Sequence, residues 1–183
     1  MSFLSGSVTY QRFGVSGENP GLFDDESLAK LREKAAGQSR MASADGIDIG
    51  WSAGKSVLDL DFTGEKNIYP GYLAFELRIA TDKLPADLLK AYYEVELKAL
   101  TAMNPSGLPS ARNKREAKEA ARDRLEAEAK DGRFRKRKCV PVLWDAARRE
   151  VLFGTNSVTH AARFCQLFHD TFDRELTPIT SGS

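Results

Sequence analysis

The chain has 183 residues, of which 42% are hydrophobic and 29% are charged, a balance that supports a folded core and excludes a disordered chain. Its net charge of +1 excludes a uniformly acidic or basic protein. Cys139 and Cys165 lack CxxC or metal-ligand spacing and are expected to be ordinary thiols. No apolar run reaches the roughly 18 residues of a membrane span, and the first residues lack a signal-peptide pattern. We therefore expect a cytoplasmic protein without membrane contact.

The first half of the chain predicts strands and one short helix. Residues 3–13 are β-prone, and Asp24 or Asp25 has the chemistry to cap the helix that follows. Residues 57–62 and 72–79 alternate apolar and polar side chains, which predicts a pair of strands.

A helix is predicted to begin with Pro85 at its first position. Four residues at helical spacing predict that this helix faces the core: Leu88, Tyr92, Val95 and Ala99. Residues 104–109 hold two prolines and a glycine and predict a break. The next helix, about residues 110–130, has a narrow apolar stripe of Ala117, Ala121 and Leu125.

Residues 133–144 predict a strand, and Pro141 predicts that it is an edge or bulged strand because proline cannot donate to a ladder. A hairpin to residues 151–154 and a final amphipathic helix, capped by Asn156 or Ser157, complete the chain.

These elements together predict an α+β fold, in which helices pack on one or more antiparallel sheets. We expect two regions that share one core. Residues 1–104 form the N-terminal α+β region. Residues 105–183 form the basic helix, the hairpin and the C-terminal helix.

Charge is concentrated in one segment. Residues 110–138 contain twelve Lys/Arg and six Asp/Glu, so this segment carries about +6 in a nearly neutral chain. Opposite charges at i,i+4 predict pairing along the helix for Arg112/Glu116, Arg115/Glu119 and Arg122/Glu126. Five of residues 133–138 are cationic and lack local acids. This pattern favours a polyanion-binding surface, although cations on an exposed strand also deter unwanted pairing.

Motifs for chemistry are weak. Residues 50–56 resemble a phosphate-binding loop, but only three residues separate the glycines and a strand is predicted to follow, so no nucleotide cofactor is expected. Asp59, Asp61 and Glu76 leave a metal-dependent nuclease as an alternative. No metal site, catalytic residue or cofactor is predicted.

The order of segments resembles the RdgC family of recombination-associated DNA-binding proteins. The matching features are Gly50-Trp51 before strands, Lys83-Leu84-Pro85 entering a helix, and the charged segment 112–119. Val142-Leu143-Trp144-Asp145 with residues 151–153 is similar to the family's hairpin, and the final helix is similar to the family's ending. The chain resembles a short form that lacks the family's further C-terminal region.

The resemblance implies an RdgC-like fold and a non-enzymatic, sequence-nonspecific DNA-binding protein acting in recombination or replication. It implies a homodimer, association with the nucleoid, and antagonism of a RecA-type recombinase. Double-stranded DNA is the expected partner, and the strand preference stays open. The candidate DNA-binding residues are Arg112, Arg115, Lys118, Arg122, Arg133, Arg135, Lys136, Arg137 and Lys138. The remaining alternative is a scaffold or interaction module without a nucleic-acid role.

Overall fold

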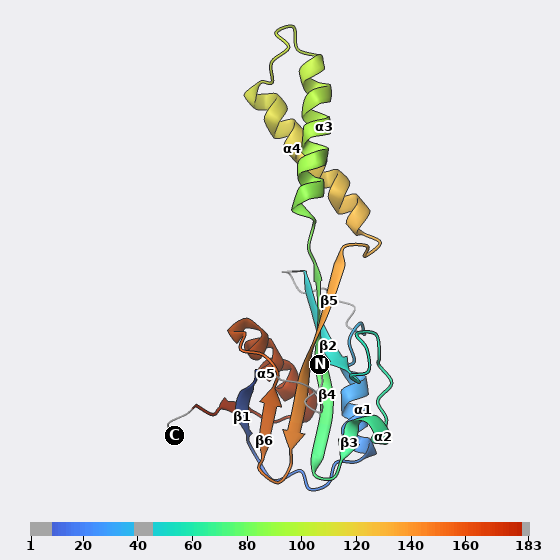
Figure 1. Ribbon diagram of the computed structural model, residues 1–183, viewed down its shortest axis with the longest axis vertical. Coiled ribbons are helices and arrows are strands. Elements are labelled where there is room, and N and C mark those ends of the chain that lie inside the picture. Colours follow the sequence, from blue (N-terminus) through green and yellow to red (C-terminus); the bar gives the residue numbers. More distant parts are fainter. Residues whose placement is uncertain (1–8, 39–45, 181–183) are drawn as a thin grey trace. The chain divides into compact units, whose positions relative to one another are not determined.

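The computed structural model describes residues 9–38 and 46–180 and shows an α+β chain with a seven-stranded antiparallel sheet and five helices (Figure 1). Contacts divide the chain into two compact units. The first unit combines residues 1–80 with 137–183, and the second comprises residues 81–136. This division differs from the expected one at residue 104, because residues from both ends of the chain build one core.

The strand order of the sheet is β2-β4-β5-β6-β1-β7, with β3 also paired to β4. The strands span Gln11–Val15 (β1), Ile47–Ser52 (β2), Ile68–Tyr69 (β3), Tyr72–Asp82 (β4), Arg135–Asp145 (β5), Glu150–Phe153 (β6) and Leu176–Pro178 (β7). In the hairpin β5–β6, Val142 faces Phe153 and Asp145 faces Glu150. Of the β-prone residues 3–13, residues 3–8 lie outside the described part of the chain.

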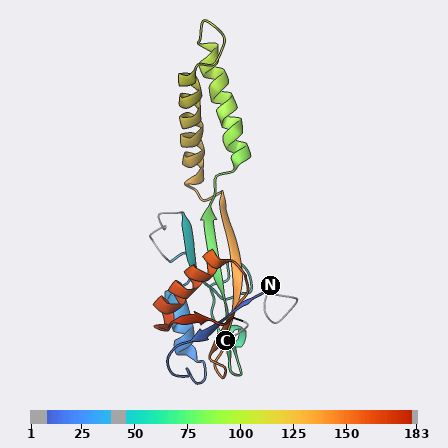
Figure 2. The ribbon, with the colours of Figure 1, turned by 90° about the vertical axis from the view of Figure 1, so that its left-hand side faces the viewer.

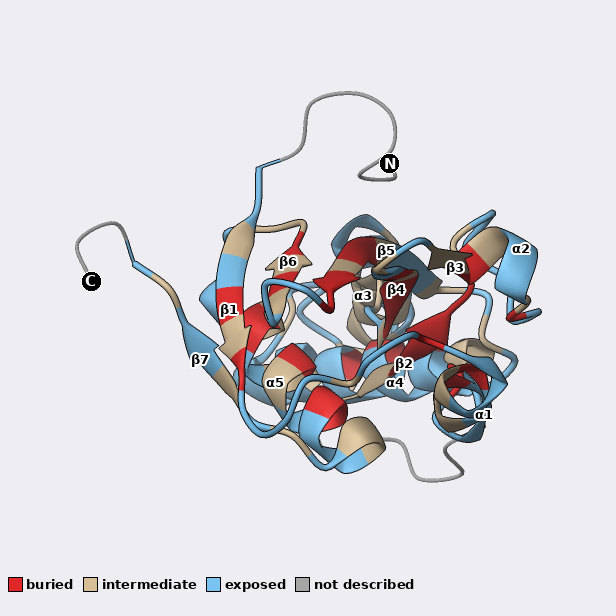
Figure 3. Ribbon diagram, turned by 90° about the horizontal axis from the view of Figure 1, so that it is seen from below, coloured by how far each residue is buried: buried red, intermediate tan, exposed pale blue. Residues whose placement is uncertain are grey.

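Helices α1 (Asp25–Glu33) and α5 (Val158–Phe172) lie on one face of this sheet (Figure 3). Asp24 caps α1, where its carboxylate accepts a hydrogen bond from the Ser27 backbone at 3.1 Å, and Ser157 caps α5. The short helix α2 (Gly64–Asn67) precedes β3.

Aromatic residues dominate the core of the first unit. Phe153 of β6 stacks on Phe164 of α5, with ring centroids 4.2 Å apart. Trp51 of β2 meets Phe75 of β4 edge-on at 5.0 Å, and Trp144 of β5 meets Phe168 of α5 at the same distance. These six side chains are all at most 2% exposed, so the sheet and α5 close on one another through aromatic packing.

Residues 57–62 do not form the predicted strand. They belong to a loop between β2 and α2, and β2 lies beside β4 in their place. Asp59 explains the difference, since its carboxylate accepts hydrogen bonds from the backbone amides of Lys55 and Asp61 at 3.2 and 3.1 Å. A side chain that satisfies nearby amides competes with ladder pairing. Only Phe62 of this segment reaches the core, at 1% exposure.

Pro141 predicted an edge or bulged strand, and the edge alternative is wrong because β5 lies between β4 and β6. The ladder between β5 and β6 begins at Val142, and Pro141 lies one residue before it. Its carbonyl accepts a hydrogen bond from Gly154 N at 2.9 Å, while no partner is needed for the N–H that proline lacks.

The second unit is a helical hairpin of α3 (Ala86–Ala102) and α4 (Ala111–Ala129), which lie side by side and antiparallel (Figure 2, green and olive). Pro85 is the N-cap residue of α3, so the helix begins at Ala86, one position later than predicted. Ala117, Ala121 and Leu125 are fully buried, which confirms the stripe of α4.

The core-facing interpretation of α3 is wrong. No residue of α3 is buried, and Val95, predicted to face the core, is 57% exposed. Partly buried Leu89, Tyr93, Leu97 and Leu100 define another stripe of this helix. Within the second unit the helix packs on α4, and one neighbouring helix covers only a narrow strip of its surface.

Candidate nucleic-acid interface

Local hydrogen bonds define the start of α4, the helix that carries several of the candidate cations. The Ser110 hydroxyl accepts a hydrogen bond from Asn113 N at 3.1 Å, and the Asn113 side chain accepts one from Ser110 N at 3.1 Å. This reciprocal cap satisfies amides that a helix start leaves unpaired. Asn113 also donates to the Leu100 carbonyl of α3 at 3.4 Å, which ties the two helices together at this end.

One side of the hairpin holds a closed network of charges. The Tyr92 hydroxyl donates to Glu128 at 2.6 Å, and the Arg124 guanidinium lies 4.2 Å from the centre of the Tyr92 ring. Arg124 also approaches Glu96 at 3.8 Å, and Arg133 approaches Glu128 at 3.7 Å. The hydrogen bond with Glu128 raises the pKa of Tyr92. Charges on this side are therefore largely compensated within the unit.

The other side of the hairpin carries a groove of about 620 Å³ between α3 and α4. Four cations line it: Lys90 from α3 and Lys114, Arg115 and Lys118 from α4. Its remaining lining residues are Ala86, Leu89, Tyr93 and Ala121. No carboxylate lines the groove, so the cations there face an apolar floor and solvent.

The four cations differ in their partners. Lys90 approaches Glu94 at 3.9 Å, at the limit of an ion pair. Among the described residues, Lys114, Arg115 and Lys118 are exposed and form no ion pair. The predicted ion pair between Arg115 and Glu119 is likewise absent from the contacts among the described residues. Three uncompensated cations within five positions are available to an anionic ligand.

Two other predicted site residues on α4 are compensated, as the i,i+4 spacing predicts. Arg112 donates to Glu116 and Arg122 donates to Glu126, each from Nε at 2.7 Å. These hydrogen bonds raise the pKa of both guanidinium groups. The sequence thus named Arg112, Arg115, Lys118 and Arg122 together, but only Arg115 and Lys118 line the groove.

The expectation that residues 133–138 lack local acids is wrong for Arg133, and Arg135 pairs with an acid far away in the chain. Arg133 donates to Asp131 at 2.9 Å from Nε and at 2.7 Å from a terminal nitrogen. Arg135 binds both carboxylate oxygens of Asp82. Asp131 was visible two residues upstream, whereas Asp82 comes close only through folding.

Lys136, Arg137 and Lys138 are exposed and have no ion pair with any described residue. Lys136 belongs to the second unit, and Arg137 and Lys138 belong to the first. Lys138 is close enough to His160 of α5 to contribute, after burial of the ring, to lowering the His160 pKa. These three side chains are exposed, and their role in DNA binding stays a prediction.

Sequence reasoning missed Lys90, Lys114 and Tyr93 as groove residues. Lys114 directly precedes Arg115 in the same cationic segment, so the sequence alone could have indicated it. Lys90 and Tyr93 lie on α3, which was expected to face a core. Only the packing of α3 against α4 brings them beside the α4 cations.

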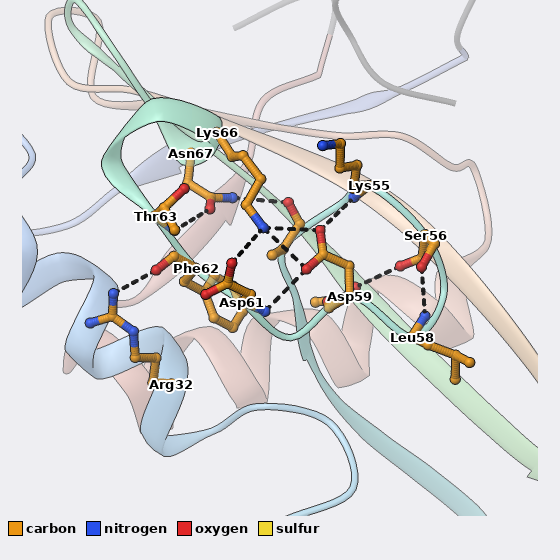
Figure 4. A network of polar contacts seen from close by, with 12 residues as sticks. Arg32, Lys55, Ser56, Leu58, Asp59, Asp61, Phe62, Thr63, Lys66 and Asn67 are labelled. Carbon is orange, nitrogen blue, oxygen red and sulfur yellow. Dashed lines mark hydrogen bonds and ion pairs between the residues drawn. The ribbon is translucent and has the colours of Figure 1, made fainter.

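Two of the three carboxylates considered for a nuclease, Asp59 and Asp61, bind Lys66 (Figure 4). Lys66 donates to Asp59 at 3.2 Å and to Asp61 at 3.4 Å. Burial would raise the pKa of Asp59, but backbone hydrogen bonds and Lys66 outweigh burial and lower it. Across residues 9–38 and 46–180, no three His, Cys, Asp or Glu side chains are grouped to hold a metal ion.

A scan against protein-family models and a search of curated proteins gave no match to this chain. Over the same described ranges, no helix combines the length and apolarity that a bilayer crossing requires. The geometry of the two units is therefore the basis for assigning a function.

Proposed function

We propose that the protein is a sequence-nonspecific DNA-binding protein, not an enzyme, and that it acts in recombination or replication in the manner of the RdgC family. The observation that carries this proposal is the groove of the hairpin, where Lys90, Lys114, Arg115 and Lys118 gather without a carboxylate. Such a local cluster of cations, on a chain that is nearly neutral overall, is suited to bind phosphate groups.

The binding mechanism is the release of counterions from the DNA backbone. Each neutralised phosphate adds close to one unit to the slope of log K against log salt for duplex DNA. Lysine and arginine side chains on an exposed helix contact phosphates without reading base edges, so little preference among sequences is expected. Lys136, Arg137 and Lys138 supply further exposed cations.

The other parts of the proposal follow from the resemblance to the RdgC family. They are an RdgC-like fold, a homodimer on double-stranded DNA, location at the nucleoid, and restraint of a RecA-type recombinase. Gly50, one of the residues that carry the resemblance, lets the backbone of residues 34–36 lie against β2.

The test is a series of binding isotherms on duplex DNA at several salt concentrations. Replacing Lys114, Arg115 and Lys118 by alanine should flatten the salt slope by about two to three units. The matched control replaces Arg112 and Arg122, which lie on the same helix but are bound by Glu116 and Glu126. An unchanged slope in the triple variant would remove the groove from the interface.

Two further assays, gel filtration and plasmid nicking, separate the two alternatives. A scaffold without a nucleic-acid role would ignore duplex DNA at physiological salt while still self-associating during gel filtration. A nuclease would nick plasmid with Mg²⁺, and the nicking would vanish in EDTA.

A further inference from the structure

The floor of the hairpin groove differs from a surface built for phosphates alone. Leu89, Ala86 and Ala121 line it together with the ring of Tyr93. A duplex presents phosphates and sugars outward and keeps its bases stacked inside, so it offers this floor no apolar partner. An unpaired strand presents both a charged backbone and flat apolar bases.

Tyr93 is placed differently from its neighbour Tyr92. The Tyr92 hydroxyl is bound to Glu128, and its ring is covered by Arg124. Tyr93 lines the groove, is partly exposed, and has no hydrogen bond to a described residue. An aromatic ring beside Lys90, Lys114 and Lys118 has the composition of a base-stacking platform with cations along its rim.

We propose that this groove binds single-stranded DNA, with an unpaired base stacked on Tyr93 and the backbone held by Lys90, Lys114, Arg115 and Lys118. The inference rests on the proposed function and names the strand type for which the groove is suited. A folded acidic peptide fits less well. An amphipathic helix needs apolar anchors over two or more turns, and this floor offers one leucine and one aromatic ring besides two alanines.

The experiment uses the full chain and two labelled probes, an oligothymidylate of about 15 nucleotides and a duplex of the same length. Replacing Tyr93 by leucine keeps an apolar floor but removes the flat ring. This variant should bind the oligothymidylate about five- to a hundredfold more weakly and the duplex within about twofold of the parent protein. Replacing Lys118 by alanine should weaken both complexes, because both contain phosphates.

A second variant reports directly on stacking and guards against a folding defect in the first. Tyr93→Trp adds one partly exposed indole to Trp51 and Trp144, which are 0% and 2% exposed. Oligothymidylate should quench its emission, and duplex should not. Circular dichroism of each variant should retain the parent's helical signal.

The outcomes separate the two proposals. Equal effects of Tyr93→Leu on both probes, or an unquenched Tyr93→Trp, would overturn the base-stacking role while leaving DNA binding intact. Failure of the parent protein to bind either probe at low salt would overturn the proposed function itself. A last outcome would also overturn the inference. If polyglutamate displaced the oligothymidylate from the Tyr93→Trp variant and quenched the indole emission equally, the groove would be a peptide site.

Discussion

Arg135 and Asp82 form a two-point ion pair, in which Nε lies 3.0 Å from one carboxylate oxygen and a terminal nitrogen lies 2.9 Å from the other. The two residues are 53 positions apart in the chain. A bidentate guanidinium–carboxylate pair satisfies the fork of donors that would otherwise face a phosphate. Arg135 is therefore held by the protein's own charge.

We expect the double replacement of Arg133 and Arg135 by alanine to change the salt slope of duplex binding by less than about one unit. Both guanidinium groups already have carboxylate partners, so few counterions are exchanged when DNA binds. Binding isotherms across a salt series measure the slope. A loss near two units would mean that both side chains leave their partners for phosphates, and the triple replacement of Lys114, Arg115 and Lys118 provides the comparison.

The network around Tyr92 is expected to stabilise the hairpin. Tyr92→Phe removes the hydroxyl that donates to Glu128 and leaves the ring beneath Arg124. Amide hydrogen exchange in residues 86–129 should become roughly fivefold faster, because one intramolecular hydrogen bond is lost. Tyr93→Phe is the matched control, since its hydroxyl has no partner among the described residues. Equal rates in the two variants would show that the Tyr92 bond contributes nothing to hairpin stability.

Gly50 is predicted to be intolerant of a side chain for packing reasons. A Cβ at this position would come within 2.4 Å of Ala36 Cα and 2.6 Å of Ala36 N. The clash involves backbone that is already bonded to β2, with Ala36 N donating to the Trp51 carbonyl at 2.9 Å. Gly50→Ala should lower the free energy of unfolding by about 1–3 kcal/mol.

Denaturant titration measures this loss. Gly64→Ala is the control, because a Cβ at Gly64 meets nothing within 4 Å. A Gly50→Ala protein as stable as the Gly64→Ala protein would show that the strand and the segment after α1 separate at little cost.

Glu76 lies in β4 at 7% exposure, and burial raises its pKa despite a hydrogen bond with the Cys139 thiol. A carboxyl whose folded pKa is raised contributes stability below its unfolded pKa and loses that contribution as pH rises through the folded pKa. Glu76→Gln removes this titration. The variant should therefore gain stability relative to the parent as pH increases from about 4 to about 7.

Urea denaturation of both proteins across this pH range gives the difference in free energy of unfolding. Glu175→Gln, which removes an exposed carboxylate from the same unit, corrects for the change in net charge. A difference that stays constant with pH, or that falls as pH rises, would contradict the raised pKa.

The sequence by itself determined the elements whose signals are local. Ala117, Ala121 and Leu125 show which stripe of α4 is buried, since a 3.6-residue period acts within one helix. The ion pairs of Arg112 and Arg122 followed from the same spacing. The α+β class followed from the mixture of both periodicities.

Tertiary structure alone decided which surfaces these elements meet. Periodicity shows that one face of α3 is apolar but not that this helix packs on α4, and alternation over residues 57–62 does not show that Asp59 binds the backbone instead of a strand partner. Asp82 compensates Arg135, and Lys90 and Tyr93 join the α4 cations, across long separations in the chain. Electrostatic and packing partners depend on distance in space, which the order of residues does not fix.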